Sequence, residues 1–459
     1  MRNPKLNSSV IGYFRCPDRY VRFVPKETAC QTRGYFQFGQ GTVCYGGYYK
    51  GQAVFSPVVT LQDALPEVVI RDGTVYLPFD PSEIAANLRS EAYVEDGSNH
   101  IVSSAWAGFY YFIRPVLSIA ARKHLQGLYL KNRKNLSFPH WPIDCSVESL
   151  HAQLLRLSLK ANGVDRIPFI WFWPNGATSC AIMTHDVETS RGRDACASLM
   201  DCDDGFGIKA SFQIVPEKRY AVTPEFLDSI RERGFEIAVH DLNHDGKLYE
   251  GRETFLKRAG KINSYAKEYR ANGFRAGALY RRQLWADVFE FSYDMSVPNV
   301  AHLDPQRGGC CTVMPYFLGK LLELPVTTTQ DYTLFHILKD YSVDLWKRQI
   351  ELIMNQHGLI QIIVHPDYIM KKREQRVYEE LLRHLVCLRE ENNIWITVPS
   401  EVNRWWRQRA AMRLVEDGNG WRIEGPGSER ACIAFASEKE GQLALTPQTG
   451  RKEELLSIS

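Results

Sequence analysis

Short apolar runs alternate with amphipathic stretches through the middle of the chain, from about residue 177 to residue 400. Brief apolar runs bounded by polar residues are typical of buried strands, and we expect strands at 179–186, 210–216, 235–240, 274–280, 289–296, 322–328 and 359–365. Three- and four-residue apolar spacing predicts helices between several of them, at 224–234, 253–269 and 344–358. Strands that alternate with helices pair in parallel, so this region predicts a layered or barrel α/β domain over residues 176–400.

The first 95 residues have a different pattern. They are rich in glycine, aromatic and β-branched residues, and apolar and polar positions alternate in 68–79 around Asp72-Gly73. An Asp-Gly pair between two alternating runs is a strong hairpin signal. Residues 1–95 are therefore expected to form a β-rich unit.

Residues 96–175 predict a helical region. Apolar residues recur every three or four positions in 109–132 and in 146–163, and the second run ends in Asn162-Gly163, a typical helix stop. The first run also carries aromatic and basic residues, as a helix lying on a membrane surface would. A helix packed against the core or a partner is the favoured interpretation.

The end of the chain, 401–459, is expected to be a helix followed by a small β appendage. Residues 400–414 read as a basic helix with two tryptophans, and the remainder alternates weakly between glycine turns. No chemistry is indicated there, and packing or solubility is the expected role.

Composition narrows the function classes. A chain of 459 residues predicts two or three domains, and 44% hydrophobic with 24% charged residues is ordinary for a globular protein. A net charge of +3 is too small to indicate nucleic acid as a partner, and no apolar run is long enough for a membrane span, although peripheral membrane contact stays open. Eleven cysteines without a CxxC pair, and no signal-peptide pattern, predict reduced thiols in the cytoplasm. The oligomeric state is not indicated.

The first candidate for chemistry is the end of the apolar run at 180–187. Asp186 and Glu188 are two residues apart, and alternation along a strand places them on one side. Two adjacent carboxylates resist joint ionisation unless a cation or an arginine lies between them. The alternative is a solvated loop with incidental charges.

The second candidate is His240 and His244, at the end of the run 235–240. Two histidines at i and i+4 on one helical turn can present both imidazoles to one ion, although surface or core histidines have the same spacing. Asp241, Asn243 and Asp245 could hydrogen-bond the imidazoles, or be ordinary loop residues.

The order of the features is more specific than any one of them. An acidic strand end, a His-x3-His, FRAGALYRR, YDMSVPN and IIVHPD follow one another over about residues 175–400. This set resembles the polysaccharide deacetylases of carbohydrate esterase family 4. The resemblance implies a distorted (β/α) barrel that holds a divalent metal, usually zinc, through one acid and two histidines. It also implies an aspartate base, an arginine on that base, and a late histidine as general acid.

Residue by residue, the resemblance assigns His240 and His244 as metal ligands, Arg275 as the arginine and His365 as the general acid. The sequence RAGALY departs from the family pattern because it lacks the usual proline at the second position after the arginine. On the substrate side, the resemblance places an oxyanion-stabilising backbone group near Leu279 and Tyr280.

The first motif departs furthest. The usual family form has two adjacent aspartates, whereas this chain has Asp186-Val187-Glu188. The family order predicts Asp186 as the base and Glu188 as the metal ligand. The opposite assignment stays open because aspartate is the usual ligand.

Two further residues are expected to face the substrate. Asp294 falls in the region of the fourth family motif, and Arg307 lies in the glycine-containing loop 298–316, where it could bind an anionic sugar or a phosphate. A second metal site in this loop has no familiar ligand spacing.

Together these residues predict a metal-dependent deacylase that removes an N- or O-acetyl group from a sugar or polysaccharide precursor. One alternative is deformylation or amide hydrolysis of a lipid-linked or other non-sugar compound. The other is a catalytically degenerate scaffold that binds carbohydrate.

Overall fold

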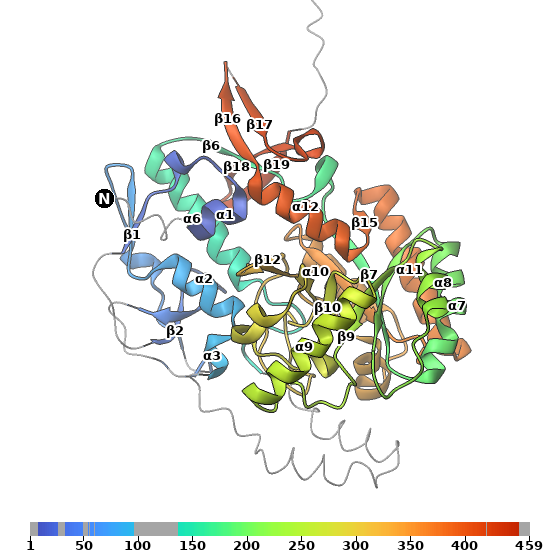
Figure 1. The fold of residues 1–459 in the computed structure, drawn as a ribbon. Coiled ribbons are helices and arrows are strands. Elements are labelled where there is room, and N and C mark those ends of the chain that lie inside the picture. Colours follow the sequence, from blue (N-terminus) through green and yellow to red (C-terminus); the bar gives the residue numbers. More distant parts are fainter. Residues whose placement is uncertain are drawn as a thin grey trace, which may run out of the picture.

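The computed structural model describes residues 8–25, 33–48, 54, 56–58, 60–95, 136–418 and 420–448 (Figure 1). The helix expected at 109–132 lies outside these residues. No helix within the described ranges is both long enough and apolar enough to cross a membrane.

A curled nine-stranded sheet forms the centre of the molecule, in the order β12-β13-β11-β10-β9-β8-β7-β14, with β15 also paired to β7. The strands are β7 Cys180–Val187, β8 Ala210–Ile214, β9 Glu236–His240, β10 Gly273–Arg275, β11 Tyr293–Asp294, β12 Tyr316–Leu318, β13 Leu321–Glu323, β14 Leu359–Val364 and β15 Trp395–Thr397. All neighbours are parallel except β12 and β13. Parallel pairing follows from the helices between the strands, because a crossover is needed to return the chain to the same edge.

The chain after β13 brings the two ends of this sheet together. The Thr328 N–H donates to the Gln361 carbonyl at 3.3 Å, and the Thr327 hydroxyl donates to the Leu359 carbonyl at 2.7 Å. These contacts lie along the free edge of β14. The sheet therefore closes on itself, which confirms the predicted distorted (β/α) barrel.

Helices cover the outside of the barrel. They are α7 Ser190–Gly205, α8 Pro224–Arg231, α9 Arg252–Glu268, α10 Asp344–Met354 and α11 Lys372–Asn392. Thr189 and Thr223 are the N-cap residues that precede α7 and α8. The hydroxyl of each accepts a hydrogen bond from a backbone N–H of the first turn. The apolar faces of the helices bury one continuous core against the sheet.

The run 322–328 contributes only Leu322 and Glu323 to the sheet, and two further predicted strands are also much shorter than their apolar runs. The run 274–280 leaves the sheet after Arg275, because Ala278 and Leu279 both have a φ of 54° and form a tight turn. The run 289–296 contributes only Tyr293 and Asp294. Apolar composition predicts burial, and both runs are mostly buried, but it does not fix the backbone conformation.

The N-terminal unit, blue in Figure 1, packs beside the barrel. Its elements are α1 Ser8–Phe14, β1 Phe23–Pro25, β2 Arg33–Gln37, β3 Val43–Gly47, β4 Val69–Arg71, β5 Thr74–Leu77, α2 Pro81–Arg89 and α3 Ala92–Glu95. The hairpin predicted at Asp72-Gly73 joins β4 and β5. The predicted second helix is α6 (Ser146–Asn162), and it ends at Gly163 with a φ of 60°, as the Asn-Gly pair indicated.

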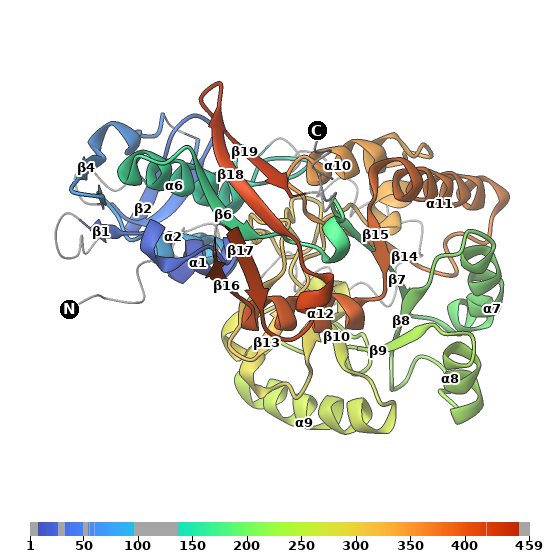
Figure 2. The same ribbon diagram turned by 90° about the horizontal axis from the view of Figure 1, so that it is seen from above.

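The C-terminal appendage forms a joint sheet with residues from before the barrel. After α12 (Pro399–Ala411) come the hairpins β16 Arg413–Asp417 with β17 Gly420–Glu424, and β18 Ile433–Lys439 with β19 Gln442–Pro447. Strand β18 pairs antiparallel with β6 (Arg166–Ile170), as Figure 2 shows. Buried Arg409 on α12 strengthens this junction by donating to the carbonyls of Trp171 and Tyr13, both at 2.9 Å.

A buried acid on α6 makes the stability of the folded protein depend on pH. Burial raises the pKa of Glu148 to about 7, although its carboxylate accepts a hydrogen bond from Thr312, and its Oε2 has no hydrogen bond within the described residues. Because the folded-state pKa exceeds the unfolded value, the folded state binds the proton more tightly, and stability falls as pH rises from about 4.5 to about 7. The full effect is about 3 kcal/mol above that range.

Glu148→Gln is therefore expected to raise the free energy of unfolding by about 3 kcal/mol at pH 8, and to change it little at pH 5. Denaturant unfolding at the two pH values measures this. Glu83→Gln on the neighbouring helix α2 is the control for the same substitution at a carboxylate that is not fully buried. An equal effect of Glu148→Gln at both pH values contradicts the prediction.

Candidate metal centre and active site

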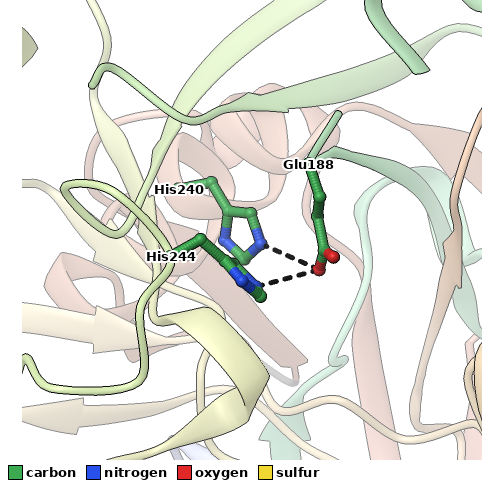
Figure 3. Close-up of side chains that lie close together, drawn as sticks. All are labelled: Glu188, His240 and His244. Carbon is green, nitrogen blue, oxygen red and sulfur yellow. Dashed lines mark ion pairs between the residues drawn. The ribbon is translucent and has the colours of Figure 1, made fainter. Parts of the chain in front are cut away.

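Glu188, His240 and His244 meet at the carboxyl ends of β7 and β9 (Figure 3). The Oε1 atom of Glu188 lies 2.9 Å from Nε2 of His244 and 3.6 Å from Nε2 of His240. Carboxyl ends of parallel strands collect functional groups because the connecting loops leave the sheet there. The structure thus brings together the three residues expected to bind a metal.

A backbone carbonyl sets the direction of the His240 imidazole, whereas Nδ1 of His244 lies 3.2 Å from Nη2 of Arg219. His240 is the last residue of β9, and its Nδ1 lies 3.1 Å from the Arg275 carbonyl on the neighbouring strand. A carbonyl only accepts, so Nδ1 carries the proton and the lone pair of Nε2 faces the centre. The sequence predicts His240 and His244 on one helical turn. The structure differs at His244. This residue lies in a loop that turns back at Asp241 and His244, where φ is 55° and 52°.

These three side chains fit a divalent cation. The Nε2 atoms of both histidines are buried, and neither makes a well-aligned hydrogen bond among the described residues, even where Glu188 is close. Burial alone would raise the pKa of Glu188, but the charge of His244 and the surrounding imidazoles hold it well below its usual range. Two imidazole nitrogens and one ionised carboxylate are a donor set that suits zinc.

Asp186 lies beside this centre, in an ion pair with Arg275. Its Oδ1 accepts from Nη1 of Arg275 at 2.6 Å, and its Oδ2 is 3.8 Å from Nε2 of His240. Burial would raise the pKa of Asp186, but the Arg275 guanidinium lowers it below the usual value. The second acid is therefore an ionised carboxylate with one oxygen turned towards the metal centre.

Arg275 is held rigidly inside the barrel. Its Nη1 also donates to the Thr184 hydroxyl at 2.8 Å, and its Nε donates to the Met295 carbonyl at 3.0 Å. In the amide orientation that gives every polar atom a partner, the Gln361 oxygen accepts from Nη2 of Arg275. Its nitrogen then donates to the carbonyls of Leu324 and Pro325, after β13. Each nitrogen of the guanidinium thus has a partner, so Asp186 is oriented as well as charged.

His365 closes the centre from the end of β14. Its Nε2 lies 3.3 Å from Oε1 of Glu188, and its Nδ1 lies 2.6 Å from Oδ1 of Asp331. The other oxygen of Asp331 accepts the His365 backbone N–H at 2.7 Å. Burial would lower the pKa of His365, but the Asp331 carboxylate raises it well above its usual value. His365 is thereby held protonated with Nε2 towards the centre.

Asp331 is a residue of the candidate site that the sequence interpretation did not identify. It belongs to the segment TTTQDYTL, which follows β13. In the sequence, Asp331 is recognisable only as an acid in a largely uncharged stretch after a predicted strand. This pattern does not indicate which residue Asp331 contacts.

The loop acids Asp241 and Asp245 hydrogen-bond groups other than the imidazoles, in agreement with the alternative of ordinary loop residues. Asp241 accepts the Leu242 N–H at 2.6 Å, and Asp245 binds Arg258 through both oxygens at 2.6 and 2.9 Å. The partner of the His240 imidazole is instead the backbone carbonyl of Arg275.

The expected substrate-facing groups have other contacts in the structure. The Tyr280 N–H donates to the Gly277 carbonyl within the turn after β10, at 3.2 Å. Asp294 is buried and accepts from Met295 N–H and the Ser296 hydroxyl, and burial raises its pKa to about 6. These roles in substrate binding stay predictions.

Arg307 lies on the loop 298–316, where its carbonyl accepts from Arg281 at 3.2 Å. This loop contacts the N-terminal unit through Gly309, which hydrogen-bonds Glu91 and Tyr93. The contact of Arg307 with an anionic group stays a prediction.

No family model matches the chain, and no curated protein matches it in sequence. Similar solved structures include a putative polysaccharide deacetylase from Mycobacterium smegmatis, with 19% identity and a TM-score of 0.43 over 52% of this chain and 93% of that one. Puue allantoinase has 12% identity and a TM-score of 0.42 over 51% and 92%. Peptidoglycan deacetylase PdaC from Bacillus subtilis has 14% identity and a TM-score of 0.33 over 52% and 96%. At these identities the likeness concerns the fold alone.

Proposed function

We propose that this protein is a metal-dependent deacylase that hydrolyses an N- or O-acetyl group of a sugar or polysaccharide precursor. One observation carries the proposal. A single oxygen, Oε1 of Glu188, lies 2.9 to 3.6 Å from the Nε2 atoms of three histidines, His240, His244 and His365, beside the Asp186–Arg275 ion pair. Metal-assisted hydrolysis requires a ligand set, a base and an acid within one centre.

Glu188, His240 and His244 would hold the ion. The Nε2 atoms of His240 and His244 lie 3.6 and 2.9 Å from Glu188, whereas the Nε2 atom of His240 lies 3.8 Å from Asp186. These distances support Glu188 as the carboxylate ligand. A divalent ion such as zinc supplies Lewis acidity, which polarises an acyl oxygen and lowers the pKa of water.

Asp186 would accept the proton of the attacking water. Its Oδ1 is engaged by Arg275, so Oδ2 is the basic atom, and it is the one that faces His240. The ion pair keeps the carboxylate ionised between turnovers, as a general base requires.

His365 would deliver a proton to the leaving amine or alcohol. The Asp331 carboxylate holds Nδ1 at 2.6 Å, so Nε2 is the nitrogen that exchanges a proton with substrate. A scaffold that only bound carbohydrate would need neither this pair nor Asp186–Arg275, so the paired acid and base favour catalysis. The sugar substrate rests on the motif resemblance, and amide hydrolysis of a non-sugar compound uses the same groups.

Metal analysis tests the proposal most directly. Wild-type protein purified without chelator is expected to hold one divalent ion per chain, and His240→Ala/His244→Ala to hold none, because two of the three ligands are removed. Elemental analysis of both proteins, with acetate release from acetylated chito-oligosaccharides, measures the two losses together. His384→Ala, on the outer helix α11, is the control with unchanged metal and activity. Equal metal content in the double variant and the wild type contradicts the proposal.

A further inference from the structure

A glutamate of the N-terminal unit reaches into the wall of the barrel. Glu91 follows α2 with a φ of 60°, and its side chain is only 7% exposed. Its Oε2 accepts Nε of Arg281 at 2.7 Å while its Oε1 accepts Nη2 of the same guanidinium, so the pair is bidentate. A forked pair fixes orientation as well as distance.

Arg281 also hydrogen-bonds two segments of the barrel. Its side chain is 2% exposed, and its Nη1 donates to the Leu279 carbonyl at 3.0 Å. Its Nη2 also donates to the Arg307 carbonyl at 3.2 Å. One guanidinium therefore links Glu91 to the turn after β10 and to the loop 298–316.

The turn held by Arg281 packs directly on the metal centre. A Cβ atom at Gly277 would lie 2.6 Å from Oδ2 of Asp241 and 3.0 Å from Cδ2 of His244, so only glycine allows this approach. The next two residues, Ala278 and Leu279, are in the left-handed region. Such a conformation costs about 1–3 kcal/mol per residue and persists only when its surroundings hold it.

Glu91 makes a second connection to the same side of the barrel. Its Oε1 accepts the Gly309 N–H at 2.6 Å, and Tyr93 donates to the Gly309 carbonyl at 2.6 Å. A Cβ at Gly308 would lie 2.5 Å from Glu91 Oε1. The loop backbone thus approaches the carboxylate more closely than a side chain would permit.

From these contacts we propose that Glu91 is a positioning residue for the metal centre, acting through Arg281 and the turn 277–279 on His244. The inference rests on the proposed metal site. It makes the N-terminal unit part of the support of that site, in addition to its role in covering the barrel.

Cobalt binding tests this inference, because the visible absorption of Co²⁺ reports its coordination geometry and is independent of substrate identity. Glu91→Gln keeps the size of the side chain but leaves Arg281 without its counter-charge, so the turn loosens. We expect a Co²⁺ dissociation constant raised about 10-fold, at the lower end of the effect of removing an outer-shell partner, and an altered absorption spectrum. Circular dichroism at the same temperature verifies that the variant is folded.

Arg281→Lys serves if Glu91→Gln does not fold. It keeps a cation beside Glu91 but loses the forked contacts, including the one to the Leu279 carbonyl, and the same spectral change is expected. Glu83→Gln is the matched control, since Glu83 is in the same unit and forms an exposed pair with Arg33 at 3.4 Å. A folded Glu91→Gln or Arg281→Lys protein with wild-type Co²⁺ affinity and spectrum overturns the inference, even if it is less stable. Failure of the wild type to bind Co²⁺ at all would instead overturn the proposed function.

Discussion

Asp186→Asn is expected to keep its metal and to turn over substrate about 10²–10⁴-fold more slowly, the range for loss of a general base. Asparagine has nearly the same shape and can still accept from Arg275, but it cannot take a proton from water.

The neighbouring acid, Glu188, should behave differently. Glu188→Gln is expected to weaken metal binding and to recover part of its activity in excess metal, because Glu188 is the proposed carboxylate ligand of the ion that His240 and His244 would also hold.

Metal content and initial rates of both variants, measured with and without added metal, distinguish these roles. Asp194→Asn is the control, because Asp194 is exposed and forms its ion pair with the adjacent Arg193, at 2.7 Å. A metal-free Asp186→Asn protein beside a loaded and active Glu188→Gln protein would show that the two roles must be exchanged.

His365→Ala is the second variant with a large expected effect. Removal of the proton donor should lower turnover by about 10²–10⁴-fold with the fold and the metal retained. Asp331→Asn should lower turnover by a smaller factor, since the imidazole stays but loses the charge that keeps it protonated. Steady-state rates and circular dichroism of both variants measure this.

The control for this pair is His140→Ala, because His140 also bonds an aspartate, Asp144 at 3.1 Å, but its side chain is nearly half exposed. If His365→Ala turns over at the wild-type rate, or unfolds, the general-acid role is wrong. If Asp331→Asn is as active as the wild type, the carboxylate does not tune His365.

Local periodicity explains the predictions that the structure confirms. Alternation along the run at 180–187 places Asp186 inside the barrel and His185 outside, where His185 contacts Asp203 of α7 at 2.8 Å. The Asp72-Gly73 hairpin and the end of α6 at Gly163 likewise depend on residues within one turn of each other. Strand and helix order then implied the parallel barrel, and the carboxyl ends of the strands brought the distant motifs together.

Tertiary structure alone decided the features that depend on partners far apart in the chain. The pairing of β6 with β18 joins residues 166–170 to the C-terminal appendage, and no pattern in either segment names the other. The loop that presents His244 has left-handed residues rather than a helical turn, and it packs against Gly277 from a distant part of the chain. A local pattern can show that an acid such as Asp331 will be buried or exposed, but it does not encode its partner. Only the folded chain places Asp331 on His365, because that contact is a product of the closed barrel.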